Sequence, residues 1–245
     1  MKTIQERRTI RKYSDRELSE TFLKDLLSKA ERTPTMGNLQ LYSVVMTTDS
    51  ENKRRLAPAH FHQPMVENAP CLLTFCADFR RTSLWAEERN ATPGYDNFLS
   101  FMNAATDALL YCQTFTYLAE SEGLGTCFLG TTIYNSESIV NALHLPRLVM
   151  PVATLTVGWP AEEGVPTDRL PIEGILHAEK YEDYTSERID RFYFEKENRE
   201  ENKHFVEINN KETLAQVFTD LRYKKEDNES MSVSFLATLK RQGFL

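Results

Sequence analysis

Apolar residues recur at helical spacing in the first part of the chain. Leu18, Phe22 and Leu26 lie four residues apart, and this period predicts an amphipathic helix. Residues 14–17 match a capping box just upstream, and Pro34 breaks the period downstream. The sequence therefore predicts a helix between these two signals.

A longer helical pattern covers residues 95–122, in which apolar positions lie three or four apart. The spacing predicts a helix much longer than average, with Gly123 as its C-terminal stop. An apolar face this long and broad suits a helix that is buried in the core or that packs against a second copy of the chain.

Short segments rich in β-branched and aromatic residues predict four strands, at residues 41–48, 71–79, 125–131 and 151–160. The second segment is almost continuously apolar, which is typical of a strand covered on both faces. Helices and strands interleave without the regular alternation of a doubly wound sheet. Because no strand is followed by GxGxxG and no GxxxxGK(S/T) segment occurs, we expect an α+β fold without a Rossmann or P-loop nucleotide site.

The composition changes after Pro160. Residues 181–229 are dominated by charged side chains, so residues 160–229 are predicted to form an exposed helical excursion rather than a second core. Apolar residues return at helical spacing in residues 230–245, which predicts a C-terminal helix. We expect residues 1–245 to form a single domain that carries this excursion.

The bulk composition narrows the class of protein. Hydrophobic residues make up 41% of the 245 positions and charged residues 27%, which is typical of a soluble globular chain. The net charge of −7 opposes binding to nucleic acid, because no basic face offsets it. The N-terminus has no apolar signal region, and no apolar run approaches the roughly 18 residues of a membrane span. We therefore expect a cytoplasmic protein that binds neither nucleic acid nor membrane.

The four cysteines lie inside apolar segments without CxxC spacing. This pattern predicts buried free thiols and argues against a disulfide framework or a zinc site. His60 and His62 form the only close histidine pair in the sequence, and no carboxylate or cysteine lies at ligand spacing from them. We interpret this pair as part of a polar loop and expect no bound metal.

A cluster of arginines near the N-terminus, in the segment RRTIR at residues 7–11, is open to two interpretations. Arg7 and Arg11 are four apart, so a helical turn would place both guanidinium groups on one side, where they could bind a phosphate. Arginines beside Glu and Lys also commonly form a solvated surface. The residues of this segment alone leave both interpretations open.

Four segments occur in the order seen in the FMN-dependent nitroreductase family: ERRTIRKYSDRELSE, TPTMGNLQLYS, ESEGLGTCFLGTTIYNSESIVNALHLP, and VATLTVGWP followed by DRLP. Over nearly its entire length the chain resembles the larger, NADPH-preferring, oxygen-insensitive branch of nitroreductases and flavin reductases. The resemblance implies an α+β nitroreductase-like fold, with a central, mostly antiparallel sheet flanked by helices and a C-terminal helical excursion. It also implies an interlocked homodimer with FMN held in clefts at the subunit interface.

The resemblance assigns residues of this chain to parts of the flavin. Four are implied to bind the phosphate and the ribityl chain: Arg7, Arg8, Thr9 and Arg11. Four are implied to reach a flavin from the partner subunit: Pro34, Thr35, Met36 and Asn38. Gln63 is implied to hydrogen-bond the polar edge of the ring. Three residues are implied to pass their backbone near its N5 atom, where a small residue permits close approach: Leu129, Gly130 and Thr131.

Two departures from the family pattern change the expected charge of the phosphate site. After the Gly-Trp-Pro turn the family has a Lys-x-Arg pair, whereas this chain has Thr167 and Arg169, of which Arg169 is still implied to bind the phosphate. Arg7 stands where the family usually has histidine. We expect the permanent charge of Arg7 to replace the missing lysine.

The candidates for NAD(P)H binding lie in the excursion: Lys196, Arg199 and Lys203. Neighbouring glutamates outnumber these cations, so the local field attracts a dianionic 2′-phosphate only weakly. We expect weak discrimination between NADPH and NADH.

The implied activity is that of an NAD(P)H-dependent FMN oxidoreductase with a ping-pong mechanism. NAD(P)H reduces FMN and leaves before a nitroaromatic, a quinone or free flavin takes up two electrons. No catalytic side chain is expected, because the flavin carries the chemistry. Three alternatives stay open: a dedicated flavin reductase or dehalogenase relative, an FMN-binding dimer without efficient turnover, and a cofactor-free structural dimer.

Overall fold

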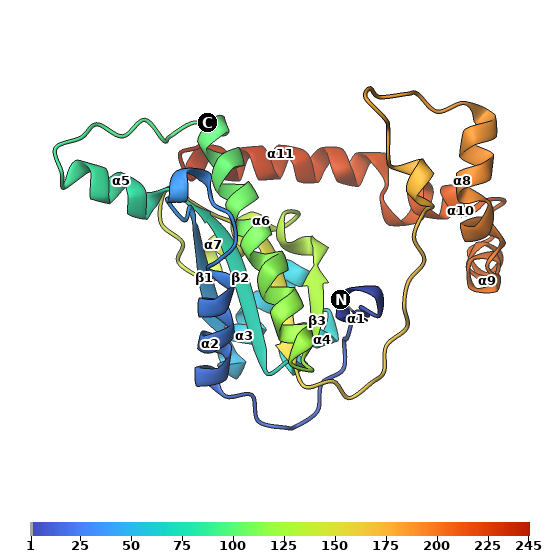
Figure 1. The fold of residues 1–245 in the computed structure, drawn as a ribbon, viewed down its shortest axis with the longest axis horizontal. Helices are drawn as coiled ribbons and strands as arrows, with labels where there is room; N and C mark the ends of the chain where they lie inside the picture. Colours follow the sequence, from blue (N-terminus) through green and yellow to red (C-terminus); the bar gives the residue numbers. More distant parts are fainter. Residues whose placement is uncertain (1) are drawn as a thin grey trace. The chain divides into compact units, whose positions relative to one another are not determined.

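The structure is a computed structural model that describes residues 2–245. The chain forms two compact units (Figure 1). The first unit comprises Met1–Pro166 and Met231–Leu245, and the second comprises Thr167–Ser230. Most of the charged excursion predicted from the sequence lies in the second unit.

The first unit is built on a sheet of four strands: β1 (Tyr42–Thr47), β2 (Cys71–Asp78), β3 (Gly125–Leu129) and β4 (Val149–Gly158). Their order is β1-β2-β4-β3, and every neighbouring pair is antiparallel. All residues of β2 and β4 are buried, because these central strands are covered on both faces. The predicted strands and the mostly antiparallel sheet are therefore confirmed.

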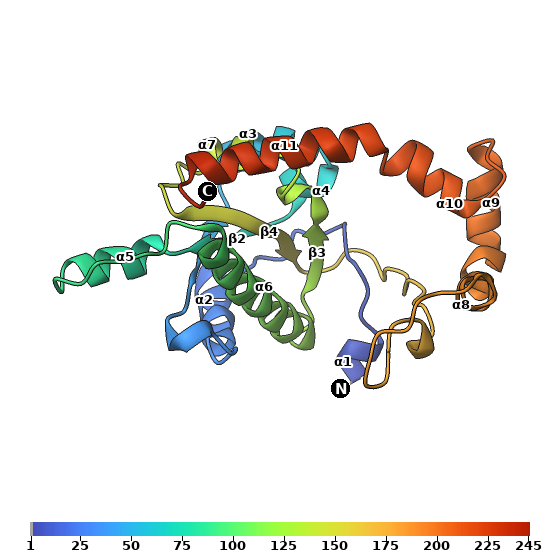
Figure 2. The ribbon, with the colours of Figure 1, turned by 90° about the horizontal axis from the view of Figure 1, so that it is seen from above.

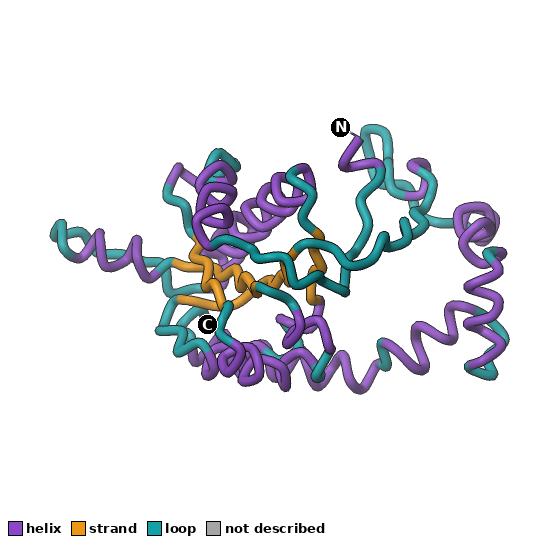
Figure 3. The backbone as a smooth tube through the Cα atoms, turned by 90° about the horizontal axis from the view of Figure 1, so that it is seen from below, coloured by secondary structure: helices purple, strands orange, loops and turns teal. Residues whose placement is uncertain are grey.

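Helices cover both faces of this sheet (Figures 2 and 3). One face packs against α2 (Glu20–Ala30) and α6 (Phe98–Ser121), and the other packs against α3 (Ser50–Leu56), α4 (Pro64–Asn68) and α7 (Ser136–Ala142). Each face has its own apolar cluster, to which alternate residues of β2 contribute. The first unit is thus a three-layer α+β structure.

The two long helical patterns of the sequence both form helices. In α6 the Asn97 side chain accepts a hydrogen bond from the Ser100 N–H, and Gly123 follows the helix at a φ of 86°. In α2 the N-cap is Ser19, so the capping box predicted at residues 14–17 was wrong. Ser14 instead donates its N–H to the Trp159 carbonyl at 2.8 Å, which ties this segment to the end of β4.

Residues 7–12 are extended rather than helical, and α1 (Lys2–Gln5) ends before them. The Ile10 N–H donates to the Thr126 carbonyl at 3.0 Å, so this segment runs beside β3. A Cβ atom at Gly125 would lie 2.7 Å from the Ile10 side chain, and glycine is therefore required for this close approach. The helical turn considered for Arg7 and Arg11 does not form.

The sequence pattern did not predict the helix α5 (Arg80–Glu87) or the two short helices α1 and α4. Short 3-10 turns occur at Met36–Asn38 (η1), Ala57–His60 (η2), Gly130–Thr132 (η3) and Ile172–Gly174 (η4). The second unit is helical, as its charged sequence predicted, with α8 (Ser186–Asn198), α9 (Glu200–Ile208), α10 (Leu214–Val217) and the π-helical turn η5 (Phe218–Arg222). The last helix, α11 (Lys225–Arg241), begins in the second unit and ends in the first.

Candidate functional site

A cavity of about 290 Å³ in the first unit, here called the arginine pocket, contains part of the predicted phosphate site. Seven residues line it: Glu6, Arg7, Arg8, Ile10, Glu120, Leu124 and Glu163. Two of the lining residues are cations and three are acids. The pocket therefore combines guanidinium donors with a local excess of carboxylates, which the sequence did not predict.

Arg7 is fixed in the arginine pocket by a buried acid on α6. Its Nε atom lies 3.4 Å from Glu120 Oε1, and the Thr126 hydroxyl donates to the same oxygen at 2.5 Å. Burial raises the pKa of Glu120, although the Thr126 hydrogen bond and the charge of Arg7 act in the opposite direction. Among residues 2–245, the terminal Nη atoms of Arg7 have no hydrogen-bond partner, and so they can receive an anion.

Arg8 and Arg11 belong to the same extended segment as Arg7. Arg8 Nη1 donates to the Glu163 carbonyl at 3.3 Å, and the Arg11 guanidinium lies beside the Cys127 thiol of β3. The backbone N–H of Arg11 donates to Glu162 Oε1 at 2.6 Å, and this bond holds the pKa of Glu162 below its usual value. In the described part of the chain no carboxylate pairs with the Arg11 side chain, which leaves its charge available to a ligand.

The other end of β3 leads to the predicted ring site. Leu129 is buried at the strand end, and a Cβ atom added at Gly130 would meet no atom within 4 Å. The surface beside Gly130 is therefore open to a flat ligand. Gly130 is three positions along the chain from Cys127, which Arg11 touches, a span of roughly 10 Å in an extended strand.

Thr131 is fixed by a histidine that the sequence suggested was in a polar loop. His60 is fully buried, and its Nδ1 atom lies 2.8 Å from Thr131 Oγ1. Burial lowers the pKa of His60 to about 4, so the ring is neutral near pH 7. Gln63 follows on the same loop, as the N-cap residue of α4, and its N–H donates to the His60 carbonyl at 3.2 Å. The histidine thus connects the predicted ring-edge residue Gln63 with Thr131.

The predicted partner-facing segment is anchored to α6 by Asp107, a carboxylate that is only 2% exposed. The Met36 N–H donates to Asp107 Oδ1 at 2.9 Å, and the Leu41 N–H donates to Oδ2 at 3.2 Å. Within this loop the Gln40 N–H donates to the Thr35 hydroxyl at 3.2 Å. The Met36 side chain is about half exposed, so the loop presents it outward.

The remaining predicted cations lie in the second unit, where each NAD(P)H candidate has an acidic partner. Lys196 Nζ lies 2.9 Å from Asp168 Oδ2, and this hydrogen bond lowers the pKa of the aspartate. The other two pairs are Arg199 with Glu201 and Lys203 with Glu200, both at 3.3 Å. The three predicted cations are therefore largely neutralised within their own unit.

Arg169 lines a cavity of about 450 Å³ in the second unit, together with Arg191, Lys196 and Phe192. Its Nη1 atom donates to the Thr167 hydroxyl at 2.6 Å, so the threonine that replaces the family lysine orients the arginine. The Arg191 guanidinium lies 4.8 Å from the centre of the Phe192 ring. The predicted role of Arg169 at the phosphate stays a prediction.

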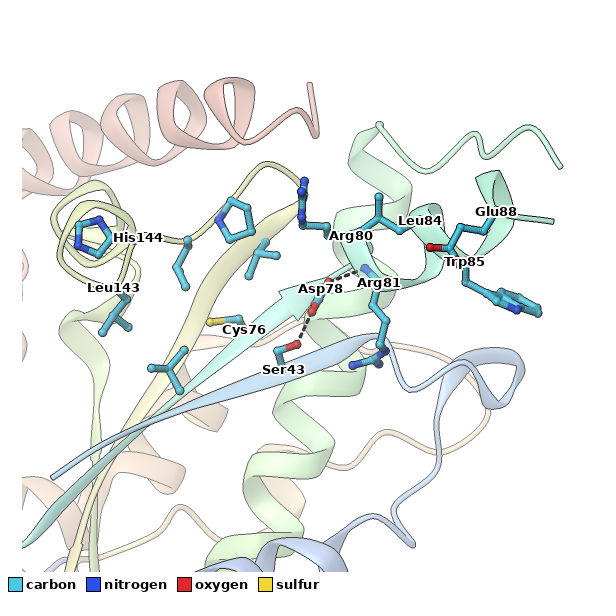
Figure 4. A pocket seen from close by; sticks show the side chains of 14 residues that line it. Ser43, Cys76, Asp78, Arg80, Arg81, Leu84, Trp85, Glu88, Leu143 and His144 are labelled. Atoms are coloured by element: carbon cyan, nitrogen blue, oxygen red, sulfur yellow. Dashed lines mark hydrogen bonds between the residues drawn. The ribbon is translucent and has the colours of Figure 1, made fainter. Parts of the chain in front are cut away.

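A separate cavity of about 640 Å³ lies between α5 and the loop at residues 143–146, and contains none of the predicted site residues (Figure 4). Two acids line it, Asp78 and Glu88. Asp78 accepts hydrogen bonds from the Ser43 hydroxyl and from the Arg81 N–H. Volume alone does not identify a site, and none of the residues implied by the family resemblance lines this cavity. We therefore assign the chemistry to the smaller arginine pocket and the Gly130 surface.

Three site residues were missed by the sequence reasoning: Glu120, His60 and Asp107. Each is a polar residue that becomes buried only when a distant segment packs on it. Asp107 did carry a signal, because it interrupts the apolar face of the long helix. Glu120 and His60 do not interrupt a periodic apolar face in this way, so the sequence carried no corresponding signal for them.

The sequence led us to expect no bound metal ion and no membrane-spanning segment. The described residues contain no group of three or more His, Cys, Asp or Glu side chains that could hold a metal ion. Among the same residues, no helix combines the length and the apolar character needed to cross a bilayer. All four cysteines are free and buried, so that prediction is confirmed.

The fold and the site together define a class of protein: an α+β chain with arginine side chains at one end of an edge strand and an open glycine surface at the other. Comparison with protein families gives a more specific assignment, because the nitroreductase family model matches residues 4–159. The chain belongs to the nitroreductase family.

Individual relatives support this assignment over most of the chain. An FMN reductase [NAD(P)H] from Bacillus subtilis is 32% identical over 186 residues, which cover 74% of each chain. A presumed oxidoreductase from Bacteroides fragilis is 59% identical, with a TM-score of 0.98 and complete coverage of both chains. The NfrA1 nitroreductase from Bacillus subtilis is 28% identical, with a TM-score of 0.85 over 99% of this chain and 98% of its own. The expected nitroreductase-like fold is confirmed.

Proposed function

We propose that this chain passes two electrons from NAD(P)H to a nitroaromatic, a quinone or free flavin by a ping-pong mechanism. Its membership of the nitroreductase family makes it an FMN- and NAD(P)H-dependent oxidoreductase. The observation that carries the finer proposal is the presence of three arginines in the segment beside β3: Arg7 and Arg8 line the arginine pocket, and Arg11 lies beside Cys127. When bound, FMN supplies the two-electron chemistry, and the side chains bind and orient it.

The residues present fit an FMN molecule. Arg7 and Arg11 offer guanidinium donors to the phosphate, and bidentate bonds of this kind are strong and directional. The Gly130 surface, where a side chain would meet nothing, is open to the flat ring. His60 holds the Thr131 hydroxyl at the ring site, and we propose that Gln63 binds the polar edge of the ring.

The coenzyme is proposed to be either NADPH or NADH, with weak discrimination between them. The acidic partners of Lys196, Arg199 and Lys203 support this proposal, because a paired cation attracts a 2′-phosphate less than a free one. Binding of a 2′-phosphate would have to displace those carboxylates first.

We also propose that the protein is a homodimer with an interface along α6. Six large apolar side chains of this helix are 37% or more exposed: Phe98, Leu99, Met102, Leu109, Leu110 and Tyr117. Such a surface marks an interaction site. A cytoplasmic location is proposed as well, because four free thiols are typical of a reducing compartment.

The test of the phosphate site is the dissociation constant of FMN, followed by flavin fluorescence. Arg11→Ala should weaken FMN binding by about one to two orders of magnitude, because it removes a charge-assisted hydrogen bond. The difference from the wild type should shrink as the salt concentration rises, because Arg11 is exposed and salt screens the charge that the variant removes. Arg54→Ala on α3 is the matched control and should bind FMN like the wild type. Wild-type affinity in both Arg7→Ala and Arg11→Ala would show that the cluster is a solvated surface.

A further inference from the structure

Glu120 is an acid placed directly against a proposed phosphate ligand. It stands on the last turn of α6, and its carboxylate touches the Arg7 guanidinium rather than solvent. The Arg7 side chain is 23% exposed, whereas that of Glu120 is 8% exposed. The following inference rests on the proposed role of Arg7 in binding the FMN phosphate.

The two oxygens of Glu120 have different surroundings. Oε1 accepts the Thr126 hydroxyl bond and faces Arg7 Nε, while Oε2 is buried without a hydrogen-bond partner among residues 2–245. A buried carboxylate with one unbonded oxygen is costly in its charged form. The carboxylate is therefore stabilised by the Thr126 hydrogen bond and by one ion pair, and that ion pair is with Arg7.

Charged groups from two segments line the arginine pocket beside this carboxylate. The N-terminal segment contributes Glu6, Arg7 and Arg8, and the loop after β4 contributes Glu163. From β3 only the uncharged Thr126 approaches it. Arg7 is the cation that forms an ion pair with Glu120, so an anion bound at its Nη atoms would share the charge of this guanidinium with Glu120.

We propose that Glu120 is the internal counter-ion of Arg7, that it competes with the FMN phosphate for this arginine, and that it takes up a proton from solvent when the phosphate binds. Glu120 is thus a positioning residue that acts through Arg7. It keeps the guanidinium in place in the free protein and opposes the phosphate in the complex. Retention of FMN then depends on pH through this carboxyl group.

The sign of the effect follows from the charges. A bound phosphate adds negative charge beside Glu120 and withdraws the field of Arg7, and both changes favour the protonated acid. Burial already acts in the same direction. In Glu120→Gln the amide oxygen can still accept the hydrogen bond from the Thr126 hydroxyl, but the negative charge beside Arg7 is gone. Removing one unit charge next to an anion site should tighten FMN binding about tenfold.

The experiment compares FMN with riboflavin, which lacks the phosphate, on the full chain after removal of bound flavin. At pH 8, Glu120→Gln should lower the dissociation constant of FMN about tenfold and leave that of riboflavin unchanged. At pH 6 the difference from wild type should shrink, because wild-type Glu120 is then more often protonated. The FMN phosphate titrates in both proteins and cancels in the comparison. Glu122→Gln, two residues along the chain, is the matched control and should not change FMN binding.

A second measurement uses the wild type alone. Calorimetric titration in two buffers of different ionisation enthalpy at pH 8 reports proton uptake by the protein, because the phosphate of free FMN, with a second pKa of about 6, is already dianionic there. We expect uptake with FMN and none with riboflavin. Equal or weaker FMN binding in Glu120→Gln, or no proton uptake, overturns the inference. If Arg7→Ala and Arg11→Ala also bind FMN normally, the proposed phosphate site itself is wrong.

Discussion

Asp107 should control both the stability of the chain and the loop that precedes β1. Its carboxylate accepts the backbone N–H groups of Met36 and Leu41 in a buried position. A hydrogen bond to a charged group contributes about 1.5 to 3 kcal/mol, so removing both bonds in Asp107→Ala should cost roughly 4 kcal/mol of unfolding free energy. For a chain of this size, that loss lowers the melting temperature by about 10 °C.

Asp107→Asn is the graded control. One amide oxygen can replace only one carboxylate oxygen, and the NH₂ group then faces an N–H donor, so this variant should lose about half as much stability. Thermal melting followed by circular dichroism measures both variants. FMN affinity should fall in the alanine variant as well, since the proposed flavin-facing residues Thr35 and Met36 lose their anchor. Melting of Asp107→Ala within about 2 °C of the wild type would refute the reasoning, because two N–H groups would have lost their acceptor without cost.

Three further predictions concern the ring site and the coenzyme. Gly130→Val should melt close to the wild type, because a Cβ atom at this position would have no contact within 4 Å, but it should bind FMN much more weakly; equal FMN binding would place the ring elsewhere. Burial lowers the pKa of His60 to about 4 from 6.5, so between these values the unfolded chain binds more protons than the folded one. The unfolding free energy should therefore fall by up to about 1.4 kcal/mol per pH unit below pH 6.5, measured by urea unfolding at pH 7 and pH 5, and the fall should be smaller in His60→Gln. The ratio of kcat/KM for NADPH to that for NADH should stay below about a hundredfold, or 2.7 kcal/mol, in steady-state assays; a larger ratio would mean that a correctly placed cation is free after all.

The fold was predictable from the sequence where its pattern is local. The apolar run at residues 71–79 predicted β2, because a strand that is buried on both faces is continuously apolar. The spacing at residues 95–122 predicted α6, because a helix that is buried along one face has apolar residues three or four positions apart. The helix α5 was missed, since it packs little and its sequence RRTSLWAE has no clear apolar face. The cap of α2 was misplaced because Ser14 bonds to Trp159, a residue distant in sequence.

The site was less predictable than the fold. Motifs and the family resemblance indicated the arginines, but not the acids that pair with them. Glu120 belongs to the segment AESEG, in which two acids stand close together, and only the packing of the N-terminal segment decides which of them is buried. The same holds for His60, whose partner Thr131 is 71 residues away. Pairing across such distances is a property of the fold and not of a local pattern.

The four buried thiols have a chemical consequence for an enzyme proposed to meet quinones. Quinones react with nucleophiles, and in cysteine the nucleophile is the thiolate. Burial raises the pKa of all four thiols, to about 12 for Cys71 and Cys112, so at neutral pH almost none is ionised or within reach. The proposed quinone substrates should therefore not alkylate these thiols, and the proposed activity should persist in the absence of a protecting reductant.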